Sequence, residues 1–161
     1  MAVDMFIKIG DIKGESKDDK HKQEIDVLAW SWGLSQSGTT HTGGGGGAGK
    51  VNVQDLSLTK WVDSSSTALM VAACKGTHIK EVKLTVRKAG ETPLEYIKIT
   101  LNEVLVSSVQ TGGSGGEDRL TENVVLNFAK FKVEYTVQAD TGGAGATSTA
   151  AWDIPANKAQ G

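Results

Sequence analysis

The glycine-rich segment 41–53, HTGGGGGAGKVNV, has the spacing of a phosphate-binding loop. Gly44, Gly49 and Lys50 match the pattern G-x-x-x-x-G-K. That pattern requires Ser or Thr after the lysine, because the hydroxyl ligates Mg²⁺ between the phosphates, and here the position is Val51. Such a loop also follows a buried strand and begins a helix, whereas polar residues precede this segment and a strand-like run follows it. We therefore expect no nucleotide site.

The other side chains that could do chemistry are scattered along the chain. His21, His41 and His78 lie in three separate turn-like contexts without paired spacing, so no metal site is predicted and the histidines are expected at surfaces or edges. Cys74 is the single cysteine, which excludes an internal disulfide, and its apolar context predicts a buried, unreactive thiol. Residues 112–116, GGSGG, fit the letters of G-x-S-x-G, but they stand in a glycine-rich segment and not at a strand-to-helix turn, so no nucleophile elbow is predicted. We expect no catalytic residue, no cofactor site and no enzyme.

Length and charge narrow the class of protein further. A chain of 161 residues is long enough for one domain with a full hydrophobic core. The net charge of -2 gives no long-range attraction to nucleic acid or to an anionic membrane. No segment has the apolar length that a membrane span requires, and the first residues lack the pattern of a signal peptide. We therefore expect the protein to fold in the cytoplasm.

Alternating apolar and polar residues predict a mainly β fold. The runs are MFIKIGDI, EIDVLAWSWGLS, VNVQDLSLTKWV, EVKLTVRKA, YIKITLNEVLVSSV and NVVLNFAKFKVEYTV. A phase slip near Asp55 indicates a bulge in the third run. Gly, Asn, Asp and Ser residues bound these runs, which is typical of an antiparallel β domain.

One helix is predicted over about residues 64–75. Asp63 or a following serine can act as its N-cap, and Gly76 stands just past its end. Leu69, Ala72 and Ala73 share one face, and the two alanines would let the helix lie close to a sheet. The remaining segment 140–161 is a variable tail of small residues with one possible short strand around Trp152 and Ile154.

The run LAWSWGLS separates bulky from small side chains. The bulky set is Leu28, Trp30, Trp32 and Leu34, and the small set is Ala29, Ser31, Gly33 and Ser35. In a strand these sets face opposite ways, so we expect the bulky set in the core and the small set outside. The small face carries no charge, unlike an ordinary solvent-facing surface. Either it lines a channel or it packs beneath the helix.

Three segments of the chain resemble the haemolysin-coregulated protein (Hcp) family, the tube subunits of bacterial type VI secretion. They are LAWSWGLSQSG, GGGGGAGKVNVQDLSLTKWVDSSSTALM and VLVSSVQTGGSGGEDRLTENVVLNFAKFKVEY. The resemblance covers nearly the whole chain in order. It implies a single antiparallel β-barrel domain over residues 1–161, flanked by a helix. It also implies homohexameric rings that stack into a hollow tube.

The resemblance carries expectations about partners and residues. A contractile sheath would drive the tube, tipped by a spike protein, out of the cell, with effector proteins carried in its lumen. The protein would thus be cytoplasmic before firing and then secreted without a signal peptide. The lumen-facing, effector-contacting residues would be Ala29, Ser31 and Gly33. The ring-stacking loop would contain Gly43, Gly44, Gly45, Gly46, Gly47 and Lys50.

An alternative from a different class of protein is a soluble carbohydrate-binding β-domain. It would use the tryptophans and the glycine-rich loops to bind a sugar. Size-exclusion chromatography distinguishes the two hypotheses, because a carbohydrate-binding domain is expected as a monomer and a tube subunit as a ring.

Overall fold

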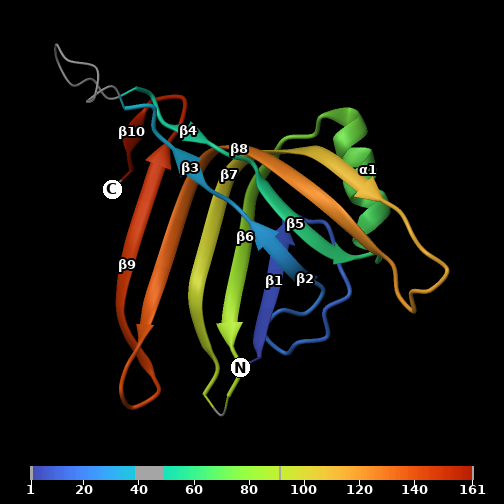
Figure 1. Ribbon diagram of the computed structural model, residues 1–161, viewed down its shortest axis with the longest axis horizontal. Coiled ribbons are helices and arrows are strands. Elements are labelled where there is room, and N and C mark those ends of the chain that lie inside the picture. The colour runs from blue at the N-terminus through green and yellow to red at the C-terminus, as the bar shows by residue number, and fades with distance from the viewer. Residues whose placement is uncertain (1, 39–48, 91, 161) are drawn as a thin grey trace.

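The computed structural model describes residues 2–38, 49–90 and 92–160 (Figure 1). Ten strands and one helix occur in this part of the chain. In order they are β1 (Val3–Ile9), β2 (Ile25–Ser31), β3 (Leu34–Ser35), β4 (Asn52–Val53), β5 (Leu56–Trp61), α1 (Ser65–Lys75), β6 (Ile79–Lys88), β7 (Leu94–Thr111), β8 (Thr121–Gln138), β9 (Ala144–Asp153) and β10 (Lys158–Ala159).

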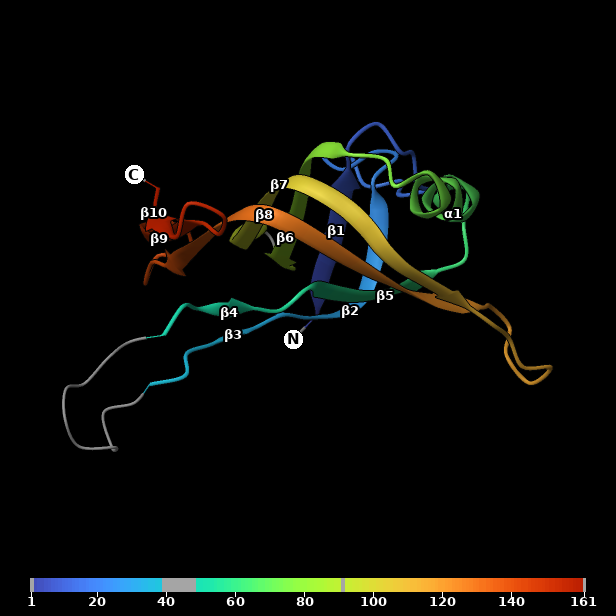
Figure 2. The same ribbon diagram turned by 90° about the horizontal axis from the view of Figure 1, so that it is seen from above.

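Six of the strands close into an antiparallel barrel. The strand order is β8-β5-β2-β1-β6-β7, and pairing of β7 with β8 completes the circle. The short strands β3 and β4 form a separate ribbon that continues from β2 and leads back to β5 (Figure 2). The predicted antiparallel β-barrel with one flanking helix is therefore confirmed.

The 18-residue strand β8 belongs both to the barrel and to an extension outside it. One edge of β8 pairs with β7. The other edge pairs with β5 over residues 121–126 and with β9 over residues 130–138. The tail therefore contains a ten-residue strand, longer than the short strand predicted around Trp152. Its residues are mostly small and exposed, so they lack the apolar alternation that marks a strand in the sequence.

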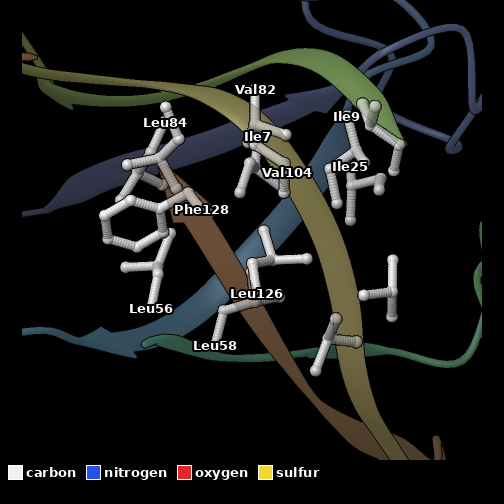
Figure 3. Close-up of a cluster of buried hydrophobic side chains, with 14 of the residues drawn as sticks. Ile7, Ile9, Ile25, Leu56, Leu58, Val82, Leu84, Val104, Leu126 and Phe128 are labelled. Carbon is white, nitrogen blue, oxygen red and sulfur yellow. The ribbon is translucent and has the colours of Figure 1, made fainter. Parts of the chain in front are cut away.

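The barrel interior is filled by aliphatic and aromatic side chains from all six strands (Figure 3). These include Ile7, Ile9, Ile25, Leu56, Leu58, Val82, Leu84, Val104, Leu126 and Phe128. Most of them stand at alternate positions along their strands, because successive side chains point to opposite faces of a sheet. In β1 and β6, Ile7, Ile9, Val82 and Leu84 are buried, in agreement with the apolar alternation of MFIKIGDI and EVKLTVRKA.

The helix α1 packs against β7. Leu69 and Ala72 are buried as predicted, and Gly76 ends the helix in the left-handed conformation with φ of 61°. Cys74, however, is exposed, so its predicted burial is wrong. At about 100° per residue, Cys74 lies about 140° around the helix from Leu69 and faces away from the barrel. The helix is too short and too polar to cross a membrane, and the described residues contain no other helix.

Candidate functional site

The outer side of four neighbouring strands carries short, uncharged side chains. The register places Ala29, Thr59, Asn123 and Gln110 in one row across β2, β5, β8 and β7. The next row consists of Ser31, Ser57, Val125 and Ser108. We call these eight residues the neutral face. They come from parts of the chain far apart in sequence, and only the sheet brings them together.

Core packing holds the neutral face outward. Trp30, Leu58 and Val124 are the neighbours of its residues along the strands and pair with one another on the barrel side. Leu58 and Val124 are buried, and Trp30 is half-buried against the core. Because side chains alternate along a strand, burial of this row orients Ser31 and Thr59 away from the core.

Two polar side chains of the neutral face bond to each other. The hydroxyl of Thr59 donates to Oδ1 of Asn123 at 2.8 Å. At the border of the face, Asp55 accepts hydrogen bonds from Asn127 at 2.9 Å and from Ser107 at 3.3 Å. The surface is therefore polar and wettable, but it offers no net charge among its eight members to hold a charged ligand.

The structure places the predicted lumen-facing residues as follows. Ala29 and Ser31 are exposed, whereas Gly33 lies past the end of β2, half-buried, with its carbonyl accepting from Gln54 N–H at 2.9 Å. Since Ala29 and Ser31 are exposed and α1 packs on β7, the hypothesis that this face packs beneath the helix is wrong. The contributions of β5 and β8 were missed, although the absence of charge at their outward positions was a usable signal.

The predicted bulky face is correct only in part. Trp30 and Trp32 pack against the core, which leaves only part of each ring for the stacking that a carbohydrate site would need. Leu28 and Leu34 are 38% and 52% exposed, so their predicted burial is wrong. For Leu28, a register shift between Val27 and Ala29 explains the difference, because this bulge moves the inward phase by one residue. Leu34 lies in β3, in the two-stranded ribbon outside the barrel.

Of the residues predicted for the ring-stacking loop, the structure describes only Lys50. Lys50 is exposed, whereas Gly43, Gly44, Gly45, Gly46 and Gly47 lie outside the described residues. His41 lies outside them as well.

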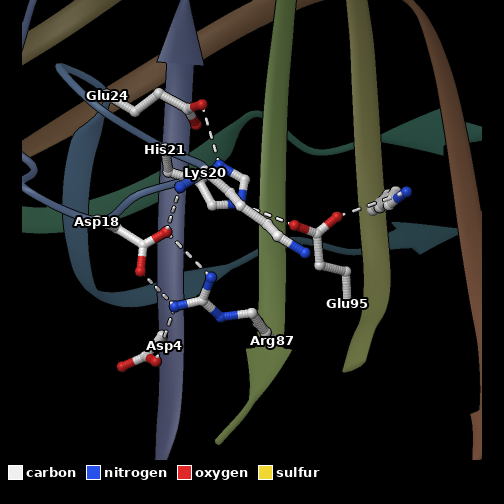
Figure 4. Close-up of polar contacts among 8 residues, drawn as sticks. Asp4, Asp18, Lys20, His21, Glu24, Arg87 and Glu95 are labelled. Carbon is white, nitrogen blue, oxygen red and sulfur yellow. Dashed lines mark hydrogen bonds and ion pairs between the residues drawn. The ribbon is translucent and has the colours of Figure 1, made fainter. Parts of the chain in front are cut away.

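A second polar site clamps residues 11–24, the polar strap, onto the barrel (Figure 4). The ring of His21 stacks on Phe6 at 4.4 Å, and its Nδ1 and Nε2 lie 3.0 Å from Glu24 and 2.8 Å from Glu95. The surface position predicted for His21 is therefore wrong, because the strap covers it. Burial opposes ionisation of Glu95, but the hydrogen bonds and charges of His21 and Lys98 together outweigh it and lower the pKa of Glu95.

The same strap is held by Arg87 of β6. Its two terminal nitrogens donate to Asp18 at 2.6 and 3.0 Å, and one of them also reaches Asp4 at 3.2 Å. The hydrogen bond from Arg87 lowers the pKa of Asp18 to about 2 and raises the pKa of the guanidinium. All of these charges satisfy one another, so the arrangement serves to hold the strap. Over residues 2–38, 49–90 and 92–160, no group of three potential metal ligands lies together.

Acid is expected to weaken this clamp. The pKa of Asp18 falls from 3.8 to about 2 on folding, so its stabilising contribution is full above about pH 4 and is lost as the pH falls to about 2. Asp18→Asn should therefore lose less stability than the unaltered protein between about pH 4 and pH 2. Urea unfolding midpoints measured across this range test the prediction, with Asp19→Asn as the neighbouring control. Parallel pH profiles for the unaltered protein and Asp18→Asn would contradict it.

Comparison with known proteins decides the family. The family model described as "Type VI secretion system effector, Hcp" matches residues 6–135. The chain belongs to the Hcp family. It is 65% identical to Protein hcp1 of Pseudomonas aeruginosa over 159 residues, which cover 98% of each chain.

Solved structures agree with the Hcp assignment. A structure titled as a type six secretion system protein superposes with a TM-score of 0.93 at 33% identity, covering 99% of this chain and 100% of that one. Hcp1 from Salmonella typhimurium gives a TM-score of 0.84 at 43% identity over the same shares. Hcp proteins assemble as rings, and this chain is a structural, secreted tube subunit of the type VI system.

Proposed function

We propose that the neutral face lines the channel of a homohexameric ring and that the rings stack into the secretion tube. The observation that carries the proposal is the run of eight outward-facing residues without a charge. Of the four strands that carry them, only β7 packs extensively against α1. Exposed strand faces ordinarily carry charged residues. A wall without them has no strong electrostatic preference among cargo proteins, so different effectors can pass it.

The remaining partners are those expected for a tube subunit of the Hcp family. Effector proteins contact the channel wall, where Ala29, Ser31 and Gly33 take part, and a contractile sheath surrounds the tube. A spike protein caps the end of the tube. The subunit folds in the cytoplasm, leaves through the secretion machine itself, and serves as carrier and chaperone with no catalytic role.

A longer side chain on the neutral face tests the channel assignment. Ser31→Gln should leave folding and ring formation unchanged, because Ser31 lies off the core. It should reduce delivery of at least one effector several-fold, because the glutamine narrows the channel and presents amide groups to cargo. Negative-stain images of the purified rings and mass spectrometry of the medium from secreting cells give the two measurements.

Ser114→Gln is the matched control, since Ser114 is exposed in the β7–β8 loop and outside the neutral face. Delivery should be normal in this variant. Unfolding or failed assembly of Ser31→Gln, together with a harmless Trp30→Ala, would show that the two faces are reversed.

The ring-stacking loop remains a prediction from family resemblance. Replacing residues 43–47 with a short linker should leave hexamers intact and weaken the association of one ring with the next. Ordering a glycine-rich sequence costs much backbone entropy, and a partner surface in the next ring could offset that cost. Analytical ultracentrifugation separates single rings from stacks, and an equal replacement of residues 112–116 serves as control. Loss of the hexamer itself would count against a stacking role.

A further inference from the structure

A groove with a volume of about 840 Å³ lies between α1 and the paired strands β1 and β6. Lys8, Lys13, Lys75, Lys80 and Lys83 line it, and all five side chains are exposed. We call this the lysine groove. Lys8 and Lys83 stand opposite each other in the β1–β6 register, and Lys75 is the last residue of α1. Three elements, β1, α1 and β6, together with the loop after β1, therefore bring the positive charges to one place.

The lysine groove is positively charged, although the chain as a whole has a negative net charge. The protein has a net charge of -2, yet the groove has five lysines against two carboxylates, those of Asp11 and Glu81. Only Lys83 has a carboxylate nearby, with Glu81 at 3.6 Å. Among the described residues, the other four lysines form no ion pair. The positive potential is thus left for a partner.

The groove also has an apolar component. Ile9, Ala72 and Ile79 are buried along its floor, and Val71 of α1 is 49% exposed at its side. An apolar floor between charged walls is the surface that an amphipathic helix recognises in helix-in-groove binding. Nucleic acid is the less suitable partner, because no aromatic residue lines the groove to stack a base.

The lysine groove and the neutral face lie on opposite sides of the barrel. In Figure 2, α1 and the beginning of β6 are at the upper side, whereas β2 and β5 are at the lower side. We infer that the lysine groove docks an acidic amphipathic helix of a partner protein, which lies beside α1. The position of this partner around the tube rests on the proposed function. The groove and its positive charge are independent of that function.

The inference is tested on the full-length protein with a designed peptide. Cys74 is exposed, is the single cysteine and lies outside the groove lining, so a fluorophore there reports binding near α1. The probe is a capped peptide of about 18 residues with leucines on one helical face and glutamates on the other. We expect saturable binding that weakens as salt rises, because exposed charges are screened. Unlabelled peptide should compete for the site.

Two pairs of variants and two further probes make the test decisive. Lys75→Glu/Lys80→Glu should weaken peptide binding at least about tenfold through like-charge repulsion. Lys17→Glu/Lys22→Glu, which changes the net charge equally in the polar strap, should leave binding unchanged. A peptide of the same composition in shuffled order and a single-stranded oligonucleotide should both bind weakly. Equal binding of the shuffled peptide, tighter binding of the oligonucleotide, equal loss in both variant pairs, or no binding would overturn the inference. Ring formation, imaged on the same samples, reports separately on the proposed function.

Discussion

Lys60→Met is expected to lower the free energy of unfolding by about 3–5 kcal/mol, the usual effect of leaving a buried charge uncompensated. Lys60 and Glu122 face each other across β5 and β8, both fully buried, and form an ion pair. The ammonium also donates to the Trp61 carbonyl at 2.8 Å and lies 3.1 Å from Asp63. Without the lysine, two carboxylates remain in the interior with no cation.

Two comparisons separate this explanation from a simple packing defect. Lys60→Met/Glu122→Leu should recover about half of the loss or more, because apolar pairs often replace buried ion pairs at little cost. Lys132→Met removes a surface pair with Glu134 at 3.7 Å and should change stability by less than about 1 kcal/mol. Urea unfolding at one protein concentration gives all three values, since assembly shifts apparent stability. Similar losses for Lys60→Met and Lys132→Met would contradict the role of burial.

Leu69→Ala is expected to destabilise the protein by about 2–5 kcal/mol, the range for a leucine removed from a packed core. Leu69 is the only residue of α1 with a large, fully buried apolar side chain. Loss of its isobutyl group leaves a cavity between the helix and the barrel.

Val71→Ala provides the control on the same helix. Val71 is two residues away and half exposed, so its truncation should change stability by less than about 0.5 kcal/mol. Thermal and urea unfolding of both variants test the difference. A loss below about 1 kcal/mol for Leu69→Ala would mean that the helix contributes little to the stability of the barrel.

Much of the barrel could be predicted because several of its strands bury one face. In β1 and β6 the burial of Ile7, Ile9, Val82 and Leu84 shows directly as alternation. In β2 the alternation predicts the wrong face for Leu28, because the bulge after Val27 changes the phase without any signal in the residue types. A single inserted position is enough to exchange the two faces of a strand.

Burial of side chains on the outer side of the barrel could not be predicted from local sequence patterns either. Histidine is usually placed at a surface, but His21 is covered because the strap folds back over Phe6 and Glu95. Such cover depends on contacts between residues 74 positions apart, which local patterns do not encode. The strand β9 was underestimated for a related reason, because pairing with β8 and not apolar character holds it.

The candidate site shows the same division. Ser31 and Ala29 could be placed on an uncharged face from one strand alone. The alignment of Ala29 with Thr59 and Asn123 depends on the register of three strands, which the sequence does not state. The neutral face is a property of the sheet, so its full extent becomes visible only when the rows are assembled.

The long pairing of β7 with β8 has a mechanical consequence. The paired residues run from Ile97 opposite Tyr135 to Thr111 opposite Glu122, whereas β10 pairs with β9 at two positions only. Hydrogen bonds between antiparallel strands stand perpendicular to the chain. A force along β7 and β8 therefore loads many of these hydrogen bonds together in shear. A force that peels β10 from β9 at the outer edge of the sheet breaks the few hydrogen bonds there one after another. The subunit is thus stiff along its longest hairpin and compliant at β10, where unravelling under load would begin.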